Sequence, residues 1–203
     1  MNKPSNNLWD ERYSQHAYAY GTQPNEFLSN QISQLPTGQA LSIGEGQGRN
    51  AVYLAKQGYA VTAVDASSVG IQQAGMFASQ EQVEINFINA DLAAYKIESS
   101  KWNLILSIYC HLPSEVRKSV HQQVVNGLAP GGMFLLEAFS PQQIHNQTGG
   151  PKNPDMLASL DQLQSELDGV TFIIAQQIER EVEEGLHHSG MASVVQILAQ
   201  KSE

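Results

Sequence analysis

Short runs of aliphatic and β-branched residues alternate with longer segments of mixed polarity along the first two thirds of the chain. Five of these runs are expected to be strands, because they are short, apolar and bounded by polar or glycine residues; they cover residues 39–44, 59–65, 85–91, 102–110 and 133–139. The segments between them have the apolar spacing of helices that pack on a sheet, namely residues 49–58, 68–82 and 114–129. This alternation predicts an α/β domain.

The last third of the chain has a different pattern. Residues 140–154 form a long polar stretch with a Gly-Gly-Pro centre, and loops this long in a compact domain are typical of lids or binding segments. Helical spacing returns over 155–167, and two strand-like segments at 170–182 and 191–200 are expected to form an antiparallel hairpin. The sequence therefore predicts a single doubly wound, Rossmann-like domain over residues 1–203, with a seven-stranded, mostly parallel sheet and an antiparallel last strand.

The excess of acidic residues disfavours negatively charged binding partners. Eleven basic against 20 acidic residues give a formal net charge of -9, which disfavours a surface that follows phosphates or binds an anionic membrane. The chain has no apolar run long enough for a transmembrane helix, and its start lacks the apolar core of a secretory signal. We therefore expect a cytoplasmic protein with no nucleic-acid or membrane partner.

The stretch LSIGEGQGRN, residues 41–50, places three glycines at alternate positions between the first expected strand and the first expected helix. Such a turn brings the backbone close to a ligand, and the helix that follows offers free N–H groups and the positive end of its dipole. The third glycine comes too early for the dinucleotide fingerprint, and no Gly-Lys-Ser/Thr sequence follows as in a phosphate loop. A tight turn without a ligand is the alternative.

Two acidic residues at the ends of successive strands strengthen the ligand interpretation. Asp65 closes the second expected strand, where a carboxylate can accept hydrogen bonds from both hydroxyls of a ribose. Asp91 closes the third expected strand, beside the place of an adenine. Either acid alone is better explained as a helix cap. Together they lie along the edge where open α/β sheets bind ligands.

These motifs resemble those of the class I S-adenosylmethionine (SAM)-dependent methyltransferases, and within them the group that includes the tellurite-resistance-type enzymes. The matching segments cover nearly the whole chain and are WDERYS, YAYGTQPNEFL, LSIGEGQGRNAVYLA, VTAVDAS, NADL, SIYCHLP, LAPGGMFLLEAF and EGLHHSGMASVVQILAQK. The resemblance implies SAM as the cofactor, S-adenosylhomocysteine as its product, and a small molecule as the methyl acceptor. The chain lacks the Asn-Pro-Pro-Tyr/Phe motif used on base amino groups, which weighs against nucleic-acid methylation.

The resemblance also implies roles for individual residues. The glycines let the backbone pass the methionyl and ribose groups, while amides near Arg49 and Asn50 face the methionine carboxylate. Asp65 holds the ribose and Asp91 the adenine amino group, and the aromatic residues of an N-terminal segment, residues 1–30, close over the cofactor. The expected cofactor-binding residues are Trp9, Tyr13, Tyr20, Gly44, Glu45, Gly46, Gly48, Arg49, Asn50, Asp65, Ala66, Asp91, Leu92 and Ser107.

The chain departs from the family at Ser42, where many members carry an acid. Glu45, three residues later, is a candidate for the missing carboxylate. The alternative is that Glu45 is an exposed turn residue with no part in binding.

The end of the fourth strand, SIYCHLP, is expected to border the methyl donor. His111 is the candidate catalytic base, because a histidine titrates near neutrality; the alternative is a histidine that orders the loop before Pro113. A base is needed only if the acceptor carries a proton to lose. Tyr109 either orients the acceptor or is a packed ring with one hydrogen bond.

Two further segments are candidates for the acceptor pocket. Gly149 and Gly150 lie in the long polar loop, which either closes over a substrate or is a flexible surface loop. His188 lies between the last two strands and either lines the pocket or is a solvated turn residue. The pair it forms with His187 lacks further ligands at fixed spacing, so we expect no metal site.

The sequence therefore predicts an enzyme that transfers a methyl group from SAM to a small molecule, with a thiol or chalcogen compound as one class of acceptor. Three alternatives remain open at this point: an O- or N-methyltransferase of a metabolite, a non-enzymatic SAM-binding module, and a nicotinamide-dependent reductase. The sequence does not indicate an oligomeric state.

Overall fold

The computed structural model describes residues 6–16, 18–185 and 189–202. Its strands are β1 Gln39–Ile43, β2 Ala60–Asp65, β3 Asn86–Asn89, β4 Trp102–Ile108, β5 Leu128–Phe139, β6 Val170–Glu183 and β7 Ser189–Lys201. Its α-helices are α1 Asn6–Gln15, α2 Glu26–Gln31, α3 Arg49–Lys56, α4 Ser68–Gln80, α5 Ser114–Gly127 and α6 Leu160–Glu166. Short 3-10 turns are η1 Ile32–Gln34, η2 Pro141–His145 and η3 Pro154–Met156.

The strands form one seven-stranded sheet in the order β3-β2-β1-β4-β5-β7-β6. Strand β7 runs antiparallel to both of its neighbours, β5 and β6, and all other neighbouring strands are parallel. The predicted fold is therefore confirmed. The chain winds outward from β1 in one direction and from β4 in the other, so the crevice between these two strands is the place where such sheets bind ligands.

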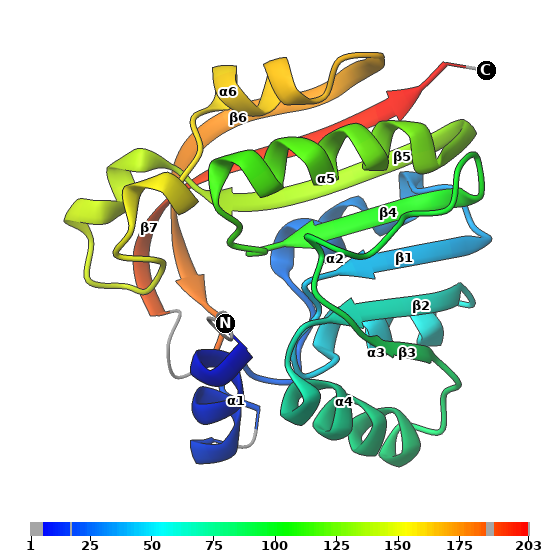
Figure 1. Ribbon diagram of the computed structural model, residues 1–203, viewed down its shortest axis with the longest axis vertical. Helices are drawn as coiled ribbons and strands as arrows, with labels where there is room; N and C mark the ends of the chain where they lie inside the picture. Colours follow the sequence, from blue (N-terminus) through cyan, green and yellow to red (C-terminus); the bar gives the residue numbers. More distant parts are fainter. Residues whose placement is uncertain (1–5, 17, 186–188, 203) are drawn as a thin grey trace.

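Helices cover both faces of the sheet, with α5 and α6 in front of it and α2 and α3 behind it in Figure 1. Alternate residues of each central strand supply the two cores. In β1, Leu41 and Ile43 belong to the core that also contains Val124 of α5, whereas Ala40 belongs to the core that contains Leu54 of α3. Burial on both faces explains why these strands are continuous apolar runs in the sequence.

The residues before β1 fold into two helices. Helix α2 begins after Asn25, whose side chain caps it by accepting a hydrogen bond from the N–H group of Leu28 at 3.1 Å. Helix α1 packs against α4, on the side toward which the arrowheads of β1, β2 and β4 point in Figure 1. The N-terminal segment thus lies at the edge of the sheet formed by the carboxyl ends of these strands.

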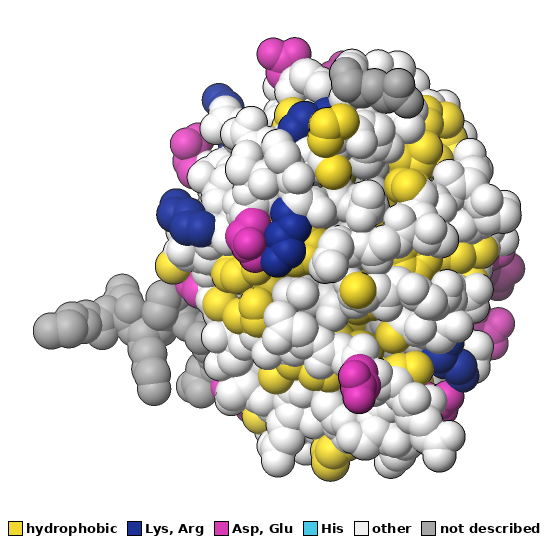
Figure 2. Space-filling model, turned by 90° about the vertical axis from the view of Figure 1, so that its right-hand side faces the viewer, with side chains coloured by type: hydrophobic (Ala, Val, Ile, Leu, Met, Phe, Trp, Pro, Cys, Tyr) yellow, Lys and Arg dark blue, Asp and Glu magenta, His cyan; other side chains and the backbone are white. Residues whose placement is uncertain are grey.

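Basic side chains on the surface are dispersed. On the face shown in Figure 2, Lys and Arg side chains are scattered singly among acidic and neutral ones. Within the described residues, no helix has both the length and the apolar character needed to cross a bilayer.

Candidate functional site

The turn after β1 contains the three alternate glycines, and all three have positive φ angles, between 65° and 95°. Two of them also approach other segments closely. A Cβ atom built on Gly44 would lie 2.6 Å from Sγ of Cys110, and one built on Gly46 would lie 2.6 Å from the hydroxyl of Tyr13. Glycine is therefore required both by the backbone conformation and by this close packing. The end of β4 and helix α1 meet at this turn.

Glu45, between the first two glycines, is buried. Its Oε1 accepts hydrogen bonds from the N–H groups of Asn50 and Ala51, both at 3.0 Å, and its Oε2 accepts one from the hydroxyl of Ser42. Burial raises the pKa of Glu45, and the hydrogen bonds oppose this rise. The alternative of an exposed turn residue is therefore wrong. The amide of Asn50, which we expected to face a methionine carboxylate, is bonded to Glu45 instead.

Asp65, at the end of β2, also holds the turn. Its carboxylate accepts hydrogen bonds from the N–H groups of Gly46 at 2.8 Å and of Ser67 at 2.7 Å. It does not cap α4, because the hydroxyl of Ser67 takes that role by accepting a hydrogen bond from Gly70 at 2.9 Å. Burial raises the pKa of Asp65. Because carboxylate oxygens have several lone pairs, Asp65 can still accept hydrogen bonds from a ligand.

The other residues expected around the adenine lie along the same edge. Asp91 follows β3 and closes a local turn, with its Oδ1 accepting a hydrogen bond from the N–H group of Ala93 at 2.9 Å. Leu92 is buried and Ala66 is half-buried. Ser107, near the end of β4, is buried beside the end of β1. The structure thus brings the predicted strand-end residues to one edge, as parallel strands require.

Helix α1 lies directly over the glycine turn. The ring of Tyr13, which is only 5% exposed, packs on that of Trp9 with centroids 5.8 Å apart and meets Tyr20 edge-on at 6.4 Å. The carboxylate of Asp10 accepts a hydrogen bond from the hydroxyl of Ser67 at 2.5 Å. The three aromatic residues that the resemblance places over the cofactor therefore come together above the turn. A ligand in the turn requires Tyr13 to shift or to pack against it.

Gln47 ties the segment after α1 to the turn, a role that sequence analysis missed. Its Oε1 accepts a hydrogen bond from the N–H group of Ala19 at 2.7 Å, and its Nε2 donates to the carbonyl of His16 at 3.1 Å. Gln73 of α4 donates a further hydrogen bond to the carbonyl of Tyr13 at 3.0 Å. Glutamines in a polar stretch give no signal of such a role in a sequence.

The residues after β4 form the edge expected to bind the acceptor. Tyr109 has a φ of 49°, which is uncommon for a non-glycine residue; its hydroxyl donates a hydrogen bond to Glu137 and its ring lies 4.6 Å from that of Phe139. His111 stacks on the same Phe139 with centroids 5.6 Å apart. Burial, together with the charge of Arg12, lowers the pKa of His111 to about 4. The imidazole is therefore neutral near pH 7.

The loop after β5 reaches this stack of rings. A Cβ atom built on Gly150 would lie 2.9 Å from the ring of Phe139, and the carbonyl of Gly149 accepts a hydrogen bond from Gln143 at 3.1 Å. The hydroxyl of Thr148 donates to the carbonyl of Met191 in β7 at 2.7 Å. The two glycines chosen from the sequence thus lie beside the expected acceptor edge.

Two sequence expectations concern other residues near this edge. His188 lies outside the described residues. Within the described part of the chain, no group of three His, Cys, Asp or Glu side chains is arranged to hold a metal ion. Burial raises the pKa of Cys110 to about 12, so its side chain is a neutral thiol.

A buried ion cluster behind Tyr109 was not predicted. Glu137 of β5 accepts hydrogen bonds from Arg180 at 2.7 Å and from Asn25 at 3.1 Å. Glu184 accepts hydrogen bonds from Arg180 at 3.0 Å and from Asn25 at 2.8 Å, and forms an ion pair with Arg49. The guanidinium of Arg49 therefore has a carboxylate partner within the protein. The one sequence signal of this cluster is the acid inside the apolar run MFLLEAF.

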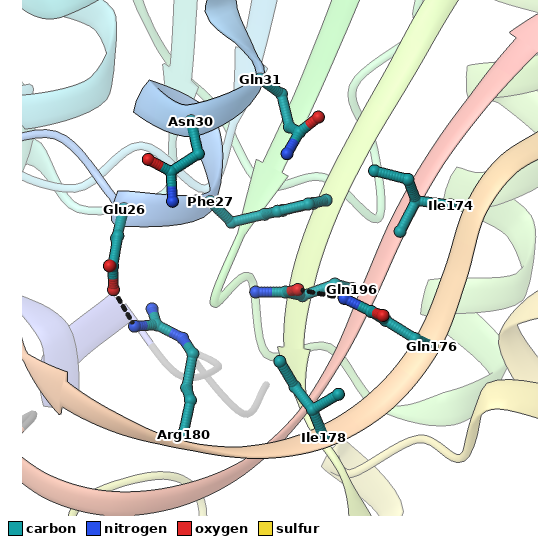
Figure 3. Close-up of a pocket in the computed structure, with 9 residues that line it drawn as sticks. All are labelled: Glu26, Phe27, Asn30, Gln31, Ile174, Gln176, Ile178, Arg180 and Gln196. Atoms are coloured by element: carbon teal, nitrogen blue, oxygen red, sulfur yellow. Dashed lines mark hydrogen bonds and ion pairs between the residues drawn. The ribbon is translucent and has the colours of Figure 1, made fainter.

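One cavity, of about 330 Å³, lies on the other side of this cluster, between α2 and the β6–β7 hairpin. Figure 3 shows Phe27 and Arg180 among its lining residues, with the exposed Glu26 bonded to Arg180 at 2.8 Å. A second cavity, of about 400 Å³, borders the amino ends of β1, β2 and β3. Neither includes a residue of the glycine turn, where Tyr13 occupies the space beside Gly46. The chemistry of the turn, rather than cavity size, locates the candidate site.

Residues 40–132 match the family model of a methyltransferase domain. Similar in sequence is a ubiquinone biosynthesis O-methyltransferase of Rickettsia conorii, which is 31% identical over 118 residues, 57% of this chain and 38% of that protein. The corresponding protein of Rickettsia felis is 30% identical over 114 residues, 55% of this chain and 44% of that protein. The chain thus matches about two fifths of the length of these relatives.

Solved structures resemble the fold over almost the whole chain. A structure described for the conversion of a disulfide bond into a thioacetal group during echinomycin biosynthesis has a TM-score of 0.77 at 17% identity, covering 97% of this chain and 91% of that one. TehB from Haemophilus influenzae has a TM-score of 0.75 at 19% identity, covering 96% of this chain and 67% of that one. The [4+2]-cyclase SpnF has a TM-score of 0.73 at 12% identity, covering 97% of this chain and 94% of that one. At these identities the likeness shows the fold alone.

The family match covers the glycine turn, the ends of β2, β3 and β4, and helix α5. The sheet order, with β7 antiparallel between β5 and β6, extends the agreement to the rest of the fold. SAM is the cofactor that this family implies. Residues 40–132 are therefore similar to methyltransferase domains, and the chain as a whole has the fold of the solved structures named above.

Proposed function

We propose that this protein transfers a methyl group from SAM to a small-molecule acceptor, and that SAM binds between the glycine turn and helix α1. The observation that carries the proposal is the turn itself, in which Gly46 permits close approach and Asp65 lies at the end of the next strand. Aromatic side chains of α1 lie above it. This arrangement offers a ribose-binding carboxylate and an apolar cover in one place.

For methyl transfer from SAM, the protein needs mainly to align the acceptor with the methyl group and to exclude water. Bound SAM supplies a methyl group that is already activated on a sulfonium. The chain orients the cofactor through Asp65 and the turn, and Trp9 and Tyr13 shield it from solvent. His111 lies at the expected acceptor edge as a neutral imidazole, so it can accept a proton from an acceptor that must lose one.

Two classes of acceptor have support. The resemblance to tellurite-resistance-type enzymes favours a thiol or chalcogen compound, as do the likenesses to TehB and to the structure described for thioacetal formation, which extend over 96% and 97% of the chain. The names of the sequence relatives favour an oxygen acceptor, but that similarity covers 57% of the chain or less. We favour the sulfur or chalcogen class, because the likenesses behind it extend over almost the whole chain, whereas the similarity to the O-methyltransferases covers little more than half of it.

The likeness to a [4+2]-cyclase supports a different kind of alternative. This protein of similar fold is named for a cyclisation and not for methyl transfer. A SAM-binding protein without transfer activity is therefore a distinct candidate. It would bind the cofactor at the same turn and release it unchanged.

The test is a transfer assay with SAM labelled in its methyl group and three acceptors: an aromatic thiol, a catechol and a primary amine. We expect labelled product from the thiol at the highest kcat/KM. The matched control is Gly46→Ala, whose added methyl group collides with the hydroxyl of Tyr13 and hinders cofactor binding. Binding of SAM without product from any acceptor class would favour the non-enzymatic alternative, and preference for the catechol would favour an O-methyltransferase.

A further inference from the structure

One buried glutamine holds the loop that follows β5. Gln143 lies in η2 and is only 1% exposed. Its Nε2 donates hydrogen bonds to the hydroxyl of Thr148 at 3.0 Å and to the carbonyl of Gly149 at 3.1 Å. Its Oε1 accepts hydrogen bonds from the N–H group of Ser193 at 2.8 Å and from the side chain of Asn146 at 3.2 Å. A glutamine amide has two donors and two lone pairs, so every hydrogen-bonding position of this side chain is used.

The same loop is also attached to the first residues of β7, beside which η2 lies. The hydroxyl of Thr148, which accepts the hydrogen bond from Gln143, donates one to the carbonyl of Met191 at 2.7 Å. A Cβ atom built on Gly190 would lie 2.8 Å from the methyl group of Thr148. The loop is therefore bonded to β7 and packed on it without any ligand, whereas a lid that closes on a ligand needs few such contacts.

The position of the loop is linked to the acceptor edge through Gly150. A Cβ atom built on Gly150 would lie 2.9 Å from the ring of Phe139 and 3.3 Å from Cγ of Gln143, so the backbone at this position packs against both side chains. The ring of Phe139 stacks in turn on that of His111, with an angle of 14° between the ring planes. A shift of Gln143 is thus passed to the acceptor edge by direct contact.

We propose that Gln143 is a positioning residue for the methyl acceptor, and that it holds residues 148–150 as a fixed wall of the acceptor pocket. The proposal rests on the proposed methyl transfer. A wall that is in place before the acceptor arrives aligns the acceptor with the methyl group and selects acceptors by size. Gln143 acts through this wall, because its own side chain is buried and its hydrogen bonds are all made within the protein.

The experiment compares wild type with Gln143→Met, which keeps the approximate size of the side chain and removes its four hydrogen bonds. Thr148→Val, which removes only the hydroxyl that links Gln143 to β7, is the milder variant and serves if Gln143→Met does not fold. Gln142→Met, at the exposed neighbouring position, is the matched control for loss of a glutamine. Val124→Ala, in the core beneath α5, is the control for lost stability.

The measurements are the affinity for S-adenosylhomocysteine, kcat/KM for thiophenol and for the larger naphthalene-2-thiol, and the rate of trypsin cleavage after Lys152 in ligand-free protein. Gln143→Met should lower kcat/KM for thiophenol roughly 10- to 100-fold, because a small misplacement of the acceptor is costly. It should change the affinity for S-adenosylhomocysteine less than about twofold. The preference between the two thiols should shift toward the larger one, and cleavage after Lys152 should become several-fold faster. Thr148→Val should have the same effects to a smaller degree.

Both controls should keep the wild-type preference between the two thiols. Equal losses for the cofactor and the acceptor in Gln143→Met, or faster cleavage of the loop with unchanged kcat/KM, would overturn the proposal. Cleavage at the wild-type rate in both loop variants would also overturn it, since Gln143 would then not hold the loop. If wild type transfers methyl groups to a catechol instead, catechol and naphthalene-2,3-diol replace the two thiols. Absence of transfer by wild type to any acceptor would refute methyl transfer itself, a result that needs no variant.

Discussion

The glycine turn and helix α1 lie on opposite sides of the candidate cofactor site and are held in different ways. The turn is fixed by buried carboxylates: Glu45 bonds the first amides of α3, and Asp65 bonds the amide of Gly46. Helix α1 is held by side-chain contacts, such as that of Asp10 with Ser67, and by the packing of Tyr13.

This difference indicates which side of the site is already formed when the ligand arrives. Backbone amides bonded to buried acids are costly to separate, because each would be left without a partner. Side-chain contacts at a half-exposed helix open at much lower cost. We therefore infer that the turn is formed before the ligand binds and that α1 opens to admit it.

The largest expected effect is on the stability of the glycine turn, which we infer to be formed before the ligand binds. Glu45→Ala should lower the free energy of unfolding by about 2–4 kcal/mol, because it leaves two buried amides and a buried hydroxyl without an acceptor. The matched change in helix α1, Asp10→Ala, should lower the free energy of unfolding by less than about 1 kcal/mol. Urea denaturation of both variants provides the measurement. Similar losses in the two variants would show that the two sides are held equally firmly.

The next effect concerns Asp65, which serves both the turn and the proposed ribose contact. Asp65→Asn should raise KM for SAM roughly 10- to 100-fold through loss of a charged acceptor. It should leave kcat at saturation nearly unchanged, because the ribose contact is the same before and during methyl transfer. Asp168→Asn, at an exposed acid that follows α6, is the control for the loss of one carboxylate. An Asp65→Asn protein that is less stable but binds SAM normally would limit Asp65 to a structural role.

A smaller effect is expected on the opening of α1. Trypsin should cleave after Arg12 several-fold more slowly when S-adenosylhomocysteine is present, since the helix must leave the site for cleavage. Cleavage after Lys152, in the loop next to Pro154, provides an internal comparison. Equal protection at both sites would indicate general stabilisation rather than closure of α1, and unchanged cleavage at Arg12 would show that α1 is no cover.

The smallest effect is the response to pH. With a pKa of about 4, His111 is neutral above about pH 5, and it takes up a proton only as the pH falls toward 4. If it is the base, kcat/KM should be flat between pH 5.5 and 8 with respect to this group, whereas an unperturbed histidine would cause a fall below about 6.5. The profile of His111→Ala should differ from wild type only in height. An inflection near 6.5 that disappears in this variant would contradict the lowered pKa of His111.

The sequence predicted the sheet and its edge better than the contacts within the site. Continuous apolar strands separated by helices fix the order of elements, and the strand ends then bring Asp65 and Asp91 to the glycine turn. The roles of Glu45 and of the Asn50 amide were not predictable, because they depend on which acid occupies the first amides of α3. The partners of Glu137 lie just before α2, just after β4, in β6 and in β7, and no local pattern connects such distant positions.

In the N-terminal segment, too, the position of the residues was more predictable than their contacts. The family resemblance predicts that its aromatic residues come together, and they do meet above the turn. Gln47 lies in the same environment but was not predicted, since a polar residue in a polar stretch resembles a solvated surface residue.

The central claim is that the glycine turn under α1 binds SAM. Calorimetric titration of the full chain with S-adenosylhomocysteine and with NAD tests it most directly. We predict saturable binding of one S-adenosylhomocysteine per chain, weakened by Asp65→Asn, and no measurable heat with NAD. Saturable binding of NAD, or no binding of S-adenosylhomocysteine to folded protein, would contradict the claim.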